Sequence, residues 1–453
     1  MEFNNKKVLV VGFGKSGLAT ARCLTGLGAK VTIGDVKPES EVNKEILREV
    51  RDSGIELEIG GHRIETFQNS DLIIVSPGVP LGIKPLAAAR EAGVPIHGEL
   101  EIASRLFDTP ILAVTGTNGK TTTVTLIDEI FKRSGRSIFA GGNLGTPLMD
   151  YASGDKNVDY VLVEVSSFQL DTAETFKPAV SLILNITPDH LDRYEGFDAY
   201  ARSKYSIVRN QGEGQYTVLN DDDPLLHGFQ PESRVTVLRY GIKKEEGRDA
   251  YIDENRLVAC IPGETEKSFA VDSFLLPGIH NLGNLMGAVL VALCAGIEPV
   301  YIQQVIFDFK GLPHRIEHVA KIAGVDFYDD SKATNVDAAV KSLEVFGDRP
   351  VILIAGGIHK GGDYGPLVDA SVSRVKKCVF LGEARFMLGD AFDNIIPYEF
   401  AEDMEDAVKK AFSAAVQDDV ILLAPACSSF DMFTDYGHRG RVFKEKVEGL
   451  IDV

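Results

Sequence analysis

ILAVTGTNGKTTTVTLIDEIFKR, residues 111–133, reads as a short apolar strand, a loop rich in glycine and threonine, and then a helix. The core of the loop, Gly119-Lys120-Thr121, is typical of a phosphate-binding loop. In such a loop backbone N–H groups surround the phosphates, the lysine neutralises their charge and the threonine can ligate Mg²⁺. Val114 stands where the full G-x-x-x-x-G-K-T pattern has its first glycine, so this loop is a shorter variant. The stretch predicts ATP or GTP with Mg²⁺ but does not identify the reaction.

Similar apolar runs recur along the chain and alternate with amphipathic helical segments. The runs are KVLVVG (7–12), LIIVSPG (72–78), ILAVTG (111–116), YVLVEVS (160–166), VSLILN (180–185), PVILIAGG (350–357) and DVILLAPA (419–426). Near-continuous apolar strands bounded by Gly, Ser or Pro are typical of parallel sheets covered on both faces. The sequence therefore predicts an α/β fold built on mostly parallel sheets.

This pattern starts three times, which predicts three domains in 453 residues. The first, 1–108, opens with a strand and a glycine-rich turn and is expected to be Rossmann-like. The second, 109–311, carries the phosphate-binding loop. The third, 312–453, is expected to be Rossmann-like and begins where FKGLPHRIEHV (309–319) changes from a linker to a strand. The charged, turn-rich stretch 228–275 is predicted to be an antiparallel flank of the second domain.

The first glycine-rich turn has the pattern G-x-G-x-x-G at Gly12, Gly14 and Gly17, between a strand and a helix. Asp35 ends the next strand, where an acid that binds ribose is expected in dinucleotide-binding folds. Three interpretations are open on these residues: a nicotinamide dinucleotide, another nucleotide diphosphate such as a UDP-sugar, or a turn without a ligand. Ser76 follows another predicted strand, in a second ligand loop or a simple turn.

Composition restricts the partners and the compartment. The net charge of −19 repels nucleic acid and anionic membranes, so we expect neither as a partner. The five cysteines are scattered without a C-x-x-C pair, which suits a reducing compartment. The first residues show no signal-peptide pattern, and the apolar stretch from Leu285 is too short to span a bilayer. We therefore expect a cytoplasmic protein without membrane insertion.

Candidate metal ligands follow two further predicted strands, at the edge of the sheet where α/β proteins bind ligands. Glu164 offers the hard oxygen ligands that Mg²⁺ prefers. His190, in NITPDHLDRY (185–194), is a less usual Mg²⁺ ligand and could equally lie in a solvated turn. Helical periodicity alone predicts that Lys204 faces solvent.

Taken together, these motifs resemble the Mur ligases over essentially the whole chain, and most closely those members that add D-glutamate to UDP-N-acetylmuramoyl-L-alanine. The matching blocks occur in the family's order: TGTNGKTTT (115–123), GNLGTP (142–147), EVSSFQL (164–170), NITPDHLDRY (185–194), Tyr200-x-x-x-Lys204, GIHNLGN (278–284), GLPHR (311–315), DDSKATN (329–335) and LAPACSSFDMF (423–433). An ordered series of this length is not explained by chance.

The resemblance implies a role for each matching residue. Residues implied to bind the UDP-linked substrate are Gly14, Lys15, Ser16, Asp35, Ser76 and Asn143. Those implied to bind ATP are Gly116, Thr117, Asn118, Gly119, Lys120, Thr121, Thr122, Asn281, Arg315, Asp330 and Lys332. Those implied to bind D-glutamate are Thr334, Lys360, Ser429 and Tyr436. Those implied to hold Mg²⁺ are Thr121, Glu164, His190 and Lys204, the last as a carbamylated lysine, and the implied catalytic residues are Lys120, His190, Lys204 and Lys332.

The implied reaction agrees with the phosphate-binding loop. ATP would convert a carboxylate into an acyl phosphate, and the amine of the amino acid would then form an amide through a tetrahedral intermediate. The resemblance places this step in peptidoglycan precursor synthesis, and hence in cell wall formation, cell shape and division. ATP and Mg²⁺ are the expected cofactors, and we expect a monomer whose third domain closes over ATP.

Other enzymes remain as alternatives at this point. A dehydrogenase would not explain the G-K-T loop or DDSKATN. A folylpolyglutamate-type ligase shares the ATP chemistry but lacks an N-terminal nucleotide domain, whereas about 110 residues precede the loop here. Sister Mur ligases with a different amino-acid specificity are the hardest to separate, because the same motifs serve them.

Overall fold

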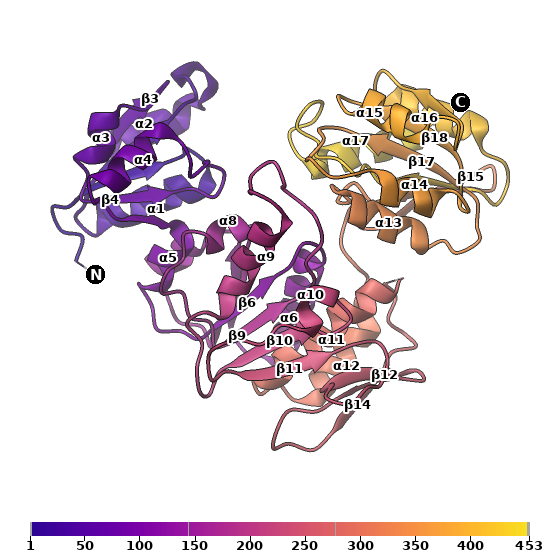
Figure 1. Ribbon diagram of the computed structural model, residues 1–453, viewed down its shortest axis with the longest axis horizontal. Coiled ribbons are helices and arrows are strands. Elements are labelled where there is room, and N and C mark those ends of the chain that lie inside the picture. The colour runs from indigo at the N-terminus through magenta and orange to yellow at the C-terminus, as the bar shows by residue number, and fades with distance from the viewer. Residues whose placement is uncertain (1, 144, 277, 451–453) are drawn as a thin grey trace. The chain divides into compact units, whose positions relative to one another are not determined.

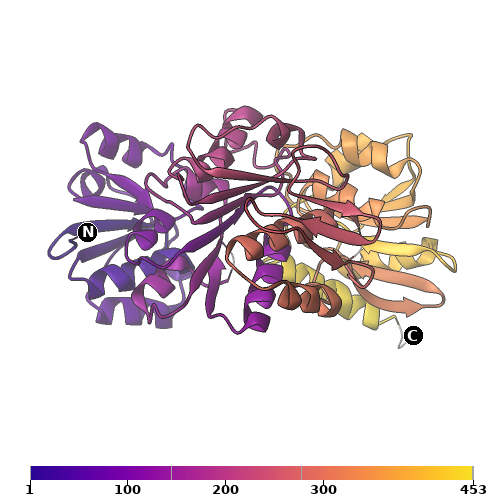
Figure 2. The same ribbon diagram turned by 90° about the horizontal axis from the view of Figure 1, so that it is seen from below.

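The structure is a computed structural model that describes residues 2–143, 145–276 and 278–450. Its strands form three sheets, each with helices packed on its faces (Figure 1, Figure 2). All seven apolar runs of the sequence analysis are strands. The predicted fold class, α/β with three mostly parallel sheets, is confirmed.

By internal packing the described chain divides into two compact units. The first contains residues 1–186, 198–272 and 283–306, and the second contains 187–197, 273–282 and 307–453. The first unit therefore carries two of the sheets, and the second carries the third sheet together with the segment around His190. The domain boundaries 1–108, 109–311 and 312–453 stay a prediction.

The first sheet is parallel throughout, in the order β3-β2-β1-β4-β5. Its strands are β1 (Lys7–Val11), β2 (Lys30–Asp35), β3 (Glu56–Ile59), β4 (Leu72–Val75) and β5 (Ile96–Gly98). Its helices are α1 (Lys15–Gly26), η1 (Glu39–Glu41), α2 (Lys44–Asp52), α3 (Ile64–Gln68), α4 (Lys84–Glu91) and α5 (Glu99–Ser104). Strand order reverses between β1 and β4, the position where doubly wound sheets bind ligands.

The second sheet has the order β14-β13-β12-β11-β10-β9-β6-β8-β7. Its strands are β6 (Ile111–Thr115), β7 (Ile138–Gly142), β8 (Tyr160–Glu164), β9 (Val180–Ile183), β10 (Tyr216–Asn220), β11 (Thr236–Tyr240), β12 (Ala250–Asp253), β13 (Arg256–Ala259) and β14 (Lys267–Ala270). Its helices are α6 (Lys120–Ser134), α7 (Leu148–Ser153), α8 (Ser167–Leu170), α9 (Phe197–Tyr205), η2 (Ser206–Val208), α10 (Pro224–His227), α11 (Ile279–Cys294) and α12 (Pro299–Asp308). The predicted antiparallel flank is correct only for β12 to β14, because β11 pairs parallel with β10.

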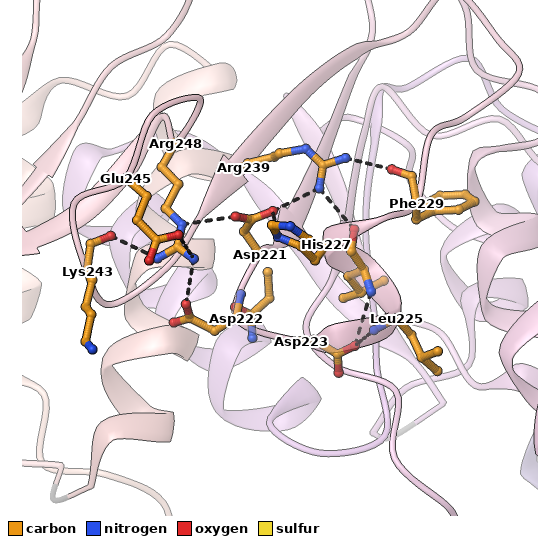
Figure 3. Close-up of polar contacts among 12 residues, drawn as sticks. Asp221, Asp222, Asp223, Leu225, His227, Phe229, Arg239, Lys243, Glu245 and Arg248 are labelled. Atoms are coloured by element: carbon orange, nitrogen blue, oxygen red, sulfur yellow. Dashed lines mark hydrogen bonds and ion pairs between the residues drawn. The ribbon is translucent and has the colours of Figure 1, made fainter.

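The charges of this flank pair with one another (Figure 3). Asp221, directly after β10, is buried and forms ion pairs with Arg239 of β11 at 3.2 Å and with Arg248 at 3.0 Å. Arg248 also bonds Asp222 and Glu245, both at 2.9 Å. Buried ion pairs are tolerated when their remaining hydrogen-bonding groups are satisfied, so we interpret this cluster as a clamp on the turn between β11 and β12.

The third sheet has the order β15-β16-β20-β17-β18-β19 and is parallel except at the edge strand β15. Its strands are β15 (Glu317–Ile322), β16 (Val325–Asp329), β17 (Val351–Gly356), β18 (Val375–Leu381), β19 (Tyr398–Phe400) and β20 (Val420–Leu423). Its helices are α13 (Val336–Glu344), α14 (Gly365–Ser371), α15 (Arg385–Phe392), α16 (Met404–Ala414) and α17 (Tyr436–Glu448). The carboxyl ends of β16, β20 and β17 are therefore adjacent, and three of the predicted ligand loops leave from them.

Two buried carboxyl groups on α5 fix the junction between the first two sheets. Glu101 accepts hydrogen bonds from Thr175 and from the backbone of Phe176, and it pairs with Arg105. Burial pushes the pKa of Glu101 up, but these bonds outweigh it and the pKa is lowered. Glu99 accepts a hydrogen bond at its Oε1 from the Met149 N–H at 2.7 Å, and its Oε2 is buried without a partner. Burial therefore raises the pKa of Glu99 to about 7.

Candidate functional site

The phosphate-binding loop adopts the conformation that its glycines predict. Gly116 has a φ of 149° and Gly119, which directly precedes α6, a φ of 85°. Both values are easily reached by glycine and strained for other residues. The Lys120 ammonium donates to the carbonyl oxygens of Gly116 and Thr117, each at 2.8 Å. The lysine is thus folded back over its own loop, where a phosphate can replace the carbonyls.

The predicted metal ligands Thr121 and Glu164 are in direct contact. The Thr121 hydroxyl donates to Glu164 Oε2 at 2.9 Å, and the Asn143 amide donates to Glu164 Oε1 at 3.1 Å. Glu164 ends β8, next to β6, and is only 3% exposed. A carboxylate, a hydroxyl and an amide oxygen close together are the donor types that suit Mg²⁺, so this group fits the expected ion.

Lys204 is buried, so the solvent-facing position predicted from periodicity is wrong. Its side chain is 2% exposed, and its ammonium donates to the Gly116 carbonyl at 2.9 Å. The ammonium also lies over the Tyr200 ring, 4.6 Å from its centre, and the Tyr200 hydroxyl bonds Thr117 at 3.1 Å. Helix α9 turns this face toward the loop, and a tertiary contact of this kind leaves no trace in helical periodicity.

Two asparagines at this loop were not among the predicted residues. The Asn185 side chain accepts from the Asn118 N–H at 2.8 Å and donates to the Asn118 carbonyl at 3.1 Å. A side chain on Gly119 would collide with the Asn284 amide. Both belong to motifs quoted above, and Asn284 follows Asn281 by one helical turn, a spacing that could have identified it. The predicted Thr122 is buried in α6.

The first glycine-rich turn is hydrogen-bonded to Asp35, the acid that the sequence analysis selected. Asp35 accepts from the Phe13 N–H at 2.6 Å and from the Lys37 N–H at 2.9 Å. Ser76 lies against Gly12, with its hydroxyl 3.5 Å from the Gly12 carbonyl. Gly14 precedes α1, so the first N–H groups of α1, at Lys15 and Ser16, lie at the switch point between β1 and β4. The predicted UDP residues of this sheet thus gather at one rim.

In the second unit, Lys332 and Tyr436 are brought together, with the ammonium 3.8 Å from the ring centre. Asp330 is buried and accepts a short hydrogen bond from Ser342, and burial raises its pKa to about 6. Arg315 is flanked by His314 and Ile316, which both have left-handed backbones with φ values of 63° and 48°. Such values are rare for a β-branched residue, so this turn is held by its surroundings.

One cluster of possible metal ligands in the described chain lies beside this turn, formed by His314, Glu317 and Asp329. His314 bonds Asp329 at 2.6 Å, and Glu317 accepts from the His314 backbone N–H at 2.8 Å. Lys444 already neutralises Glu317 at 2.6 Å. The cluster therefore has its own cation, and we interpret it as the support of the strained turn that carries Arg315.

The predicted D-glutamate residues lie on adjacent loops. The Lys360 ammonium is 3.5 Å from the Thr334 hydroxyl and 3.5 Å from Asp189 Oδ1. Asp189, which sequence analysis did not select, also bonds the Asn335 amide at 3.1 Å. It therefore holds the segment of the neighbouring His190, whose φ of 54° is left-handed, close to these loops.

The remaining residues of this group come from the loop after β20. Ser429 is 2% exposed, and its carbonyl accepts from the Phe433 N–H at 2.9 Å, which closes the loop into a turn. Cys427 is fully buried, and burial raises the pKa of its thiol to about 11. Cys427 therefore serves as a small buried packing residue and not as a nucleophile. Asn281 is also buried.

Comparison with known proteins identifies the family. Family models match residues 6–98 as "Mur ligase MurD-like, N-terminal domain", 114–292 as "Mur ligase middle domain" and 314–427 as "Mur ligase, glutamate ligase domain". The chain is 42% identical over 450 residues to a protein of Geotalea daltonii named UDP-N-acetylmuramoylalanine--D-glutamate ligase, covering 99% of both chains. This chain belongs to the Mur ligase family. The resemblance stated from the motifs is confirmed.

A second relative supports the assignment of this chain to the Mur ligase family, and a solved structure has the same fold. A protein of the same name from Desulfosudis oleivorans is 44% identical over 452 residues, covering 99% of this chain and 98% of the relative. The UDP-N-acetylmuramate-alanine ligase of Thermotoga maritima has a TM-score of 0.60 at 20% identity, covering 98% of this chain and 100% of that one. The second likeness shows the fold of the Mur ligase and no more. In the part of this Mur ligase that the structure describes, no helix is both long and apolar enough to cross a membrane.

Proposed function

We propose that this Mur ligase is the ATP-dependent ligase that joins D-glutamate to UDP-N-acetylmuramoyl-L-alanine in peptidoglycan precursor synthesis in the cytoplasm. The observation that carries the proposal is the identity of 42% and 44% over nearly the whole chain to ligases of that name. Sister ligases are the alternative, and the solved Thermotoga maritima sister is only 20% identical.

The contacts of the phosphate-binding loop support the activation half of the reaction. Lys120 and the N–H groups at the start of α6 would bind the phosphates of ATP and oppose the charge that develops during phosphoryl transfer. Thr121 and Glu164 would hold Mg²⁺, which offsets phosphate charge when bound. The substrate carboxylate would become an acyl phosphate, a far better electrophile than the carboxylate itself.

Burial of Lys204 supports its proposed carbamylation. Burying an ammonium is costly, and the ammonium groups of Lys204 and Lys120 both donate to the Gly116 carbonyl. A carbamate would turn this repulsion into an attraction for Lys120 and for Mg²⁺ beside Glu164. His190 and Lys332 are proposed as a metal-side positioning residue and a charge partner of the phosphates.

The second half of the reaction would use the loops of the third sheet. Thr334, Lys360, Ser429 and Tyr436 would hold D-glutamate, with Lys360 as the cation for one of its carboxylates. UDP would be held by Gly14, Lys15, Ser16, Asp35 and Ser76, with Asn143 toward the sugar, and ATP also by Asn281, Arg315 and Asp330.

The experiment that tests this proposal is phosphate release from ATP by the purified protein with Mg²⁺ and UDP-N-acetylmuramoyl-L-alanine. D-Glutamate, L-glutamate, L-alanine and a diamino acid are compared in parallel. Release that requires both the nucleotide substrate and D-glutamate, with formation of the amide, is expected. Turnover with another amino acid but not with D-glutamate would assign the chain to a sister specificity, and omission of the UDP-linked substrate controls for uncoupled hydrolysis.

A further inference from the structure

A single buried arginine in α17 lies behind the loops of the third sheet. Arg439 is 2% exposed, although its side chain is among the largest in the protein. Its guanidinium makes four hydrogen bonds: Nε to Ser331 Oγ at 2.9 Å, Nη2 to the Ser331 carbonyl at 2.8 Å, and Nη1 to the carbonyls of Cys427 at 3.2 Å and Gly356 at 3.4 Å. All of these acceptors are neutral.

Ser331 and Cys427 lie in the loops that follow β16 and β20, and Gly356 ends β17, directly before a third loop. Ser331 precedes Thr334 by three positions, Gly356 precedes Lys360 by four, and Cys427 precedes Ser429 by two. Each loop is therefore fixed near its base, a few residues before a proposed D-glutamate residue. Backbone bonds between the loops, such as Ala426 N–H to the Ala333 carbonyl at 2.9 Å, complete the frame.

The fourth segment of the site is fixed through the same group. Ser331 Oγ accepts from Arg439 and donates to the carbonyl of Tyr436 at 2.8 Å. On the opposite side of Cys427, its thiol lies 3.1 Å from the Tyr364 hydroxyl, which also bonds the His359 ring at 2.9 Å. The base of the site is thus one connected set of hydrogen bonds with the guanidinium at its centre.

A neutral side chain would be the less costly solution if packing were the only requirement. Burying a charged guanidinium is costly, and here the cost is offset by the hydrogen bonds to neutral acceptors and by the attraction of the carboxylates of Asp431, Asp329 and Asp330. Guanidinium has a planar fork of five donors, which no other side chain offers, and its charge adds a positive potential beneath a site for a dianionic amino acid. Burial lowers the pKa of Arg439 to about 10, so it is still a cation at neutral pH.

We propose that Arg439 is a positioning residue for the amino-acid substrate: its buried guanidinium sets the mutual spacing of the three loops and favours an anionic ligand above them. The inference rests on the proposed function for the site, but it does not depend on which acidic amino acid binds. It concerns binding of the amino acid and leaves the UDP-linked substrate unaffected, because the residues assigned to that substrate belong to the first two sheets.

The test compares Arg439→Lys with Val447→Ala, a matched control. Val447 is also fully buried in α17, but it belongs to the hydrophobic cluster that contains Phe327 and Phe443. Both variants are expected to melt at lower temperature than wild type. Only Arg439→Lys is expected to raise the KM for D-glutamate, by roughly tenfold, since it keeps the charge but loses the fork. The KM for UDP-N-acetylmuramoyl-L-alanine is expected to be unchanged in both.

Amide hydrogen exchange provides a readout that does not need turnover. Arg439→Lys is expected to speed exchange in 331–334, 357–360 and 427–430 together, and Val447→Ala is not. Ser331→Ala, which removes one acceptor and keeps the arginine, serves if Arg439→Lys does not fold, with a smaller rise in the same KM expected. The proposal would be overturned if Arg439→Lys and Ser331→Ala had the same KM for D-glutamate as wild type. It would also be overturned if either variant raised the KM for D-glutamate and the KM for UDP-N-acetylmuramoyl-L-alanine equally. Wild type that uses another amino acid refutes the proposed specificity instead, and the comparison is then made with that amino acid.

Discussion

Replacing Glu99 by glutamine should stabilise the protein, by an amount that grows as the pH rises above 4.5 and levels off above about pH 7. Glu99 is 2% exposed, with one carboxylate oxygen bonded to the Met149 N–H and the other buried without a partner. Its pKa rises from 4.5 to about 7 on folding because burial disfavours the charged form. Glutamine has the same shape and can accept the same N–H bond without carrying a charge.

The magnitude follows from the proton linkage. Below pH 4.5 the carboxyl is protonated in both states, so it does not affect stability. Between pH 4.5 and about pH 7 the unfolded chain loses this proton while the folded protein keeps it, so stability falls as pH rises. Each pH unit in this window costs about 1.4 kcal/mol, so the charged carboxylate costs about 3 kcal/mol at pH 8.

Urea unfolding of wild type and Glu99→Gln, at about pH 5 and about pH 8, measures this difference. The free energies of unfolding of the two proteins should be similar at the lower pH. At the higher pH the free energy of unfolding of the glutamine variant should exceed that of wild type by up to about 3 kcal/mol. Glu101→Gln is the matched control, two residues further along α5. The pKa of Glu101 is lowered because its hydrogen bonds favour the charged form. Glu101→Gln should therefore destabilise the protein at both pH values, by about 2 kcal/mol or more. A Glu99→Gln variant that gains no stability at pH 8 would refute the reasoning.

Three further predictions concern the proposed site. Glu164→Gln should lower kcat by at least about a hundredfold with little change in thermal stability, because one metal-binding oxygen is replaced by an amide, and steady-state kinetics over a range of Mg²⁺ concentrations measures this. Lys204→Arg should lose activity to a similar degree, and intact mass spectrometry should find one added carboxylate in wild type and none in the variant. The KM for ATP should rise as pH falls below about 6, as Asp330 becomes protonated, and Asp330→Asn should raise it at all pH values and remove this dependence.

Most of the fold could be predicted, because it is encoded locally. The run before Gly12 is apolar after Lys7 and the run before Gly116 is apolar up to Thr115, which identifies central parallel strands before any contact is known. The flank beyond β10 was predicted less well, since its charges and turns suggested antiparallel strands throughout and β11 pairs parallel with β10. Arg239 and Arg248 are in fact paired with Asp221, a partner distant in sequence. Local pattern cannot show which charges satisfy one another.

The candidate site divides in the same way. Thr121 was chosen from the G-K-T motif and Glu164 for its carboxylate at a strand end, and the structure places them in contact. The burial of Lys204 was invisible, because it depends on the Gly116 carbonyl far along the chain. Asp189 and Arg439 were missed because charged residues in a turn and on a helix usually face water. Only their tertiary partners distinguish them from ordinary surface residues.

The hydrogen bonds of Arg439 hold the bases of the three loops independently of the side chains at the loop tips. The guanidinium bonds mostly backbone carbonyls and one serine, so it depends little on the side chains at the loop tips. Substitutions at Thr334, Lys360 or Ser429 can thus change the ligand without loosening the base. For protein engineering, the positions of Thr334, Lys360 and Ser429 can be randomised together to seek new amino-acid specificities. Ser331, Gly356 and Arg439 would be left unchanged, because they hold the bases of the three loops in place.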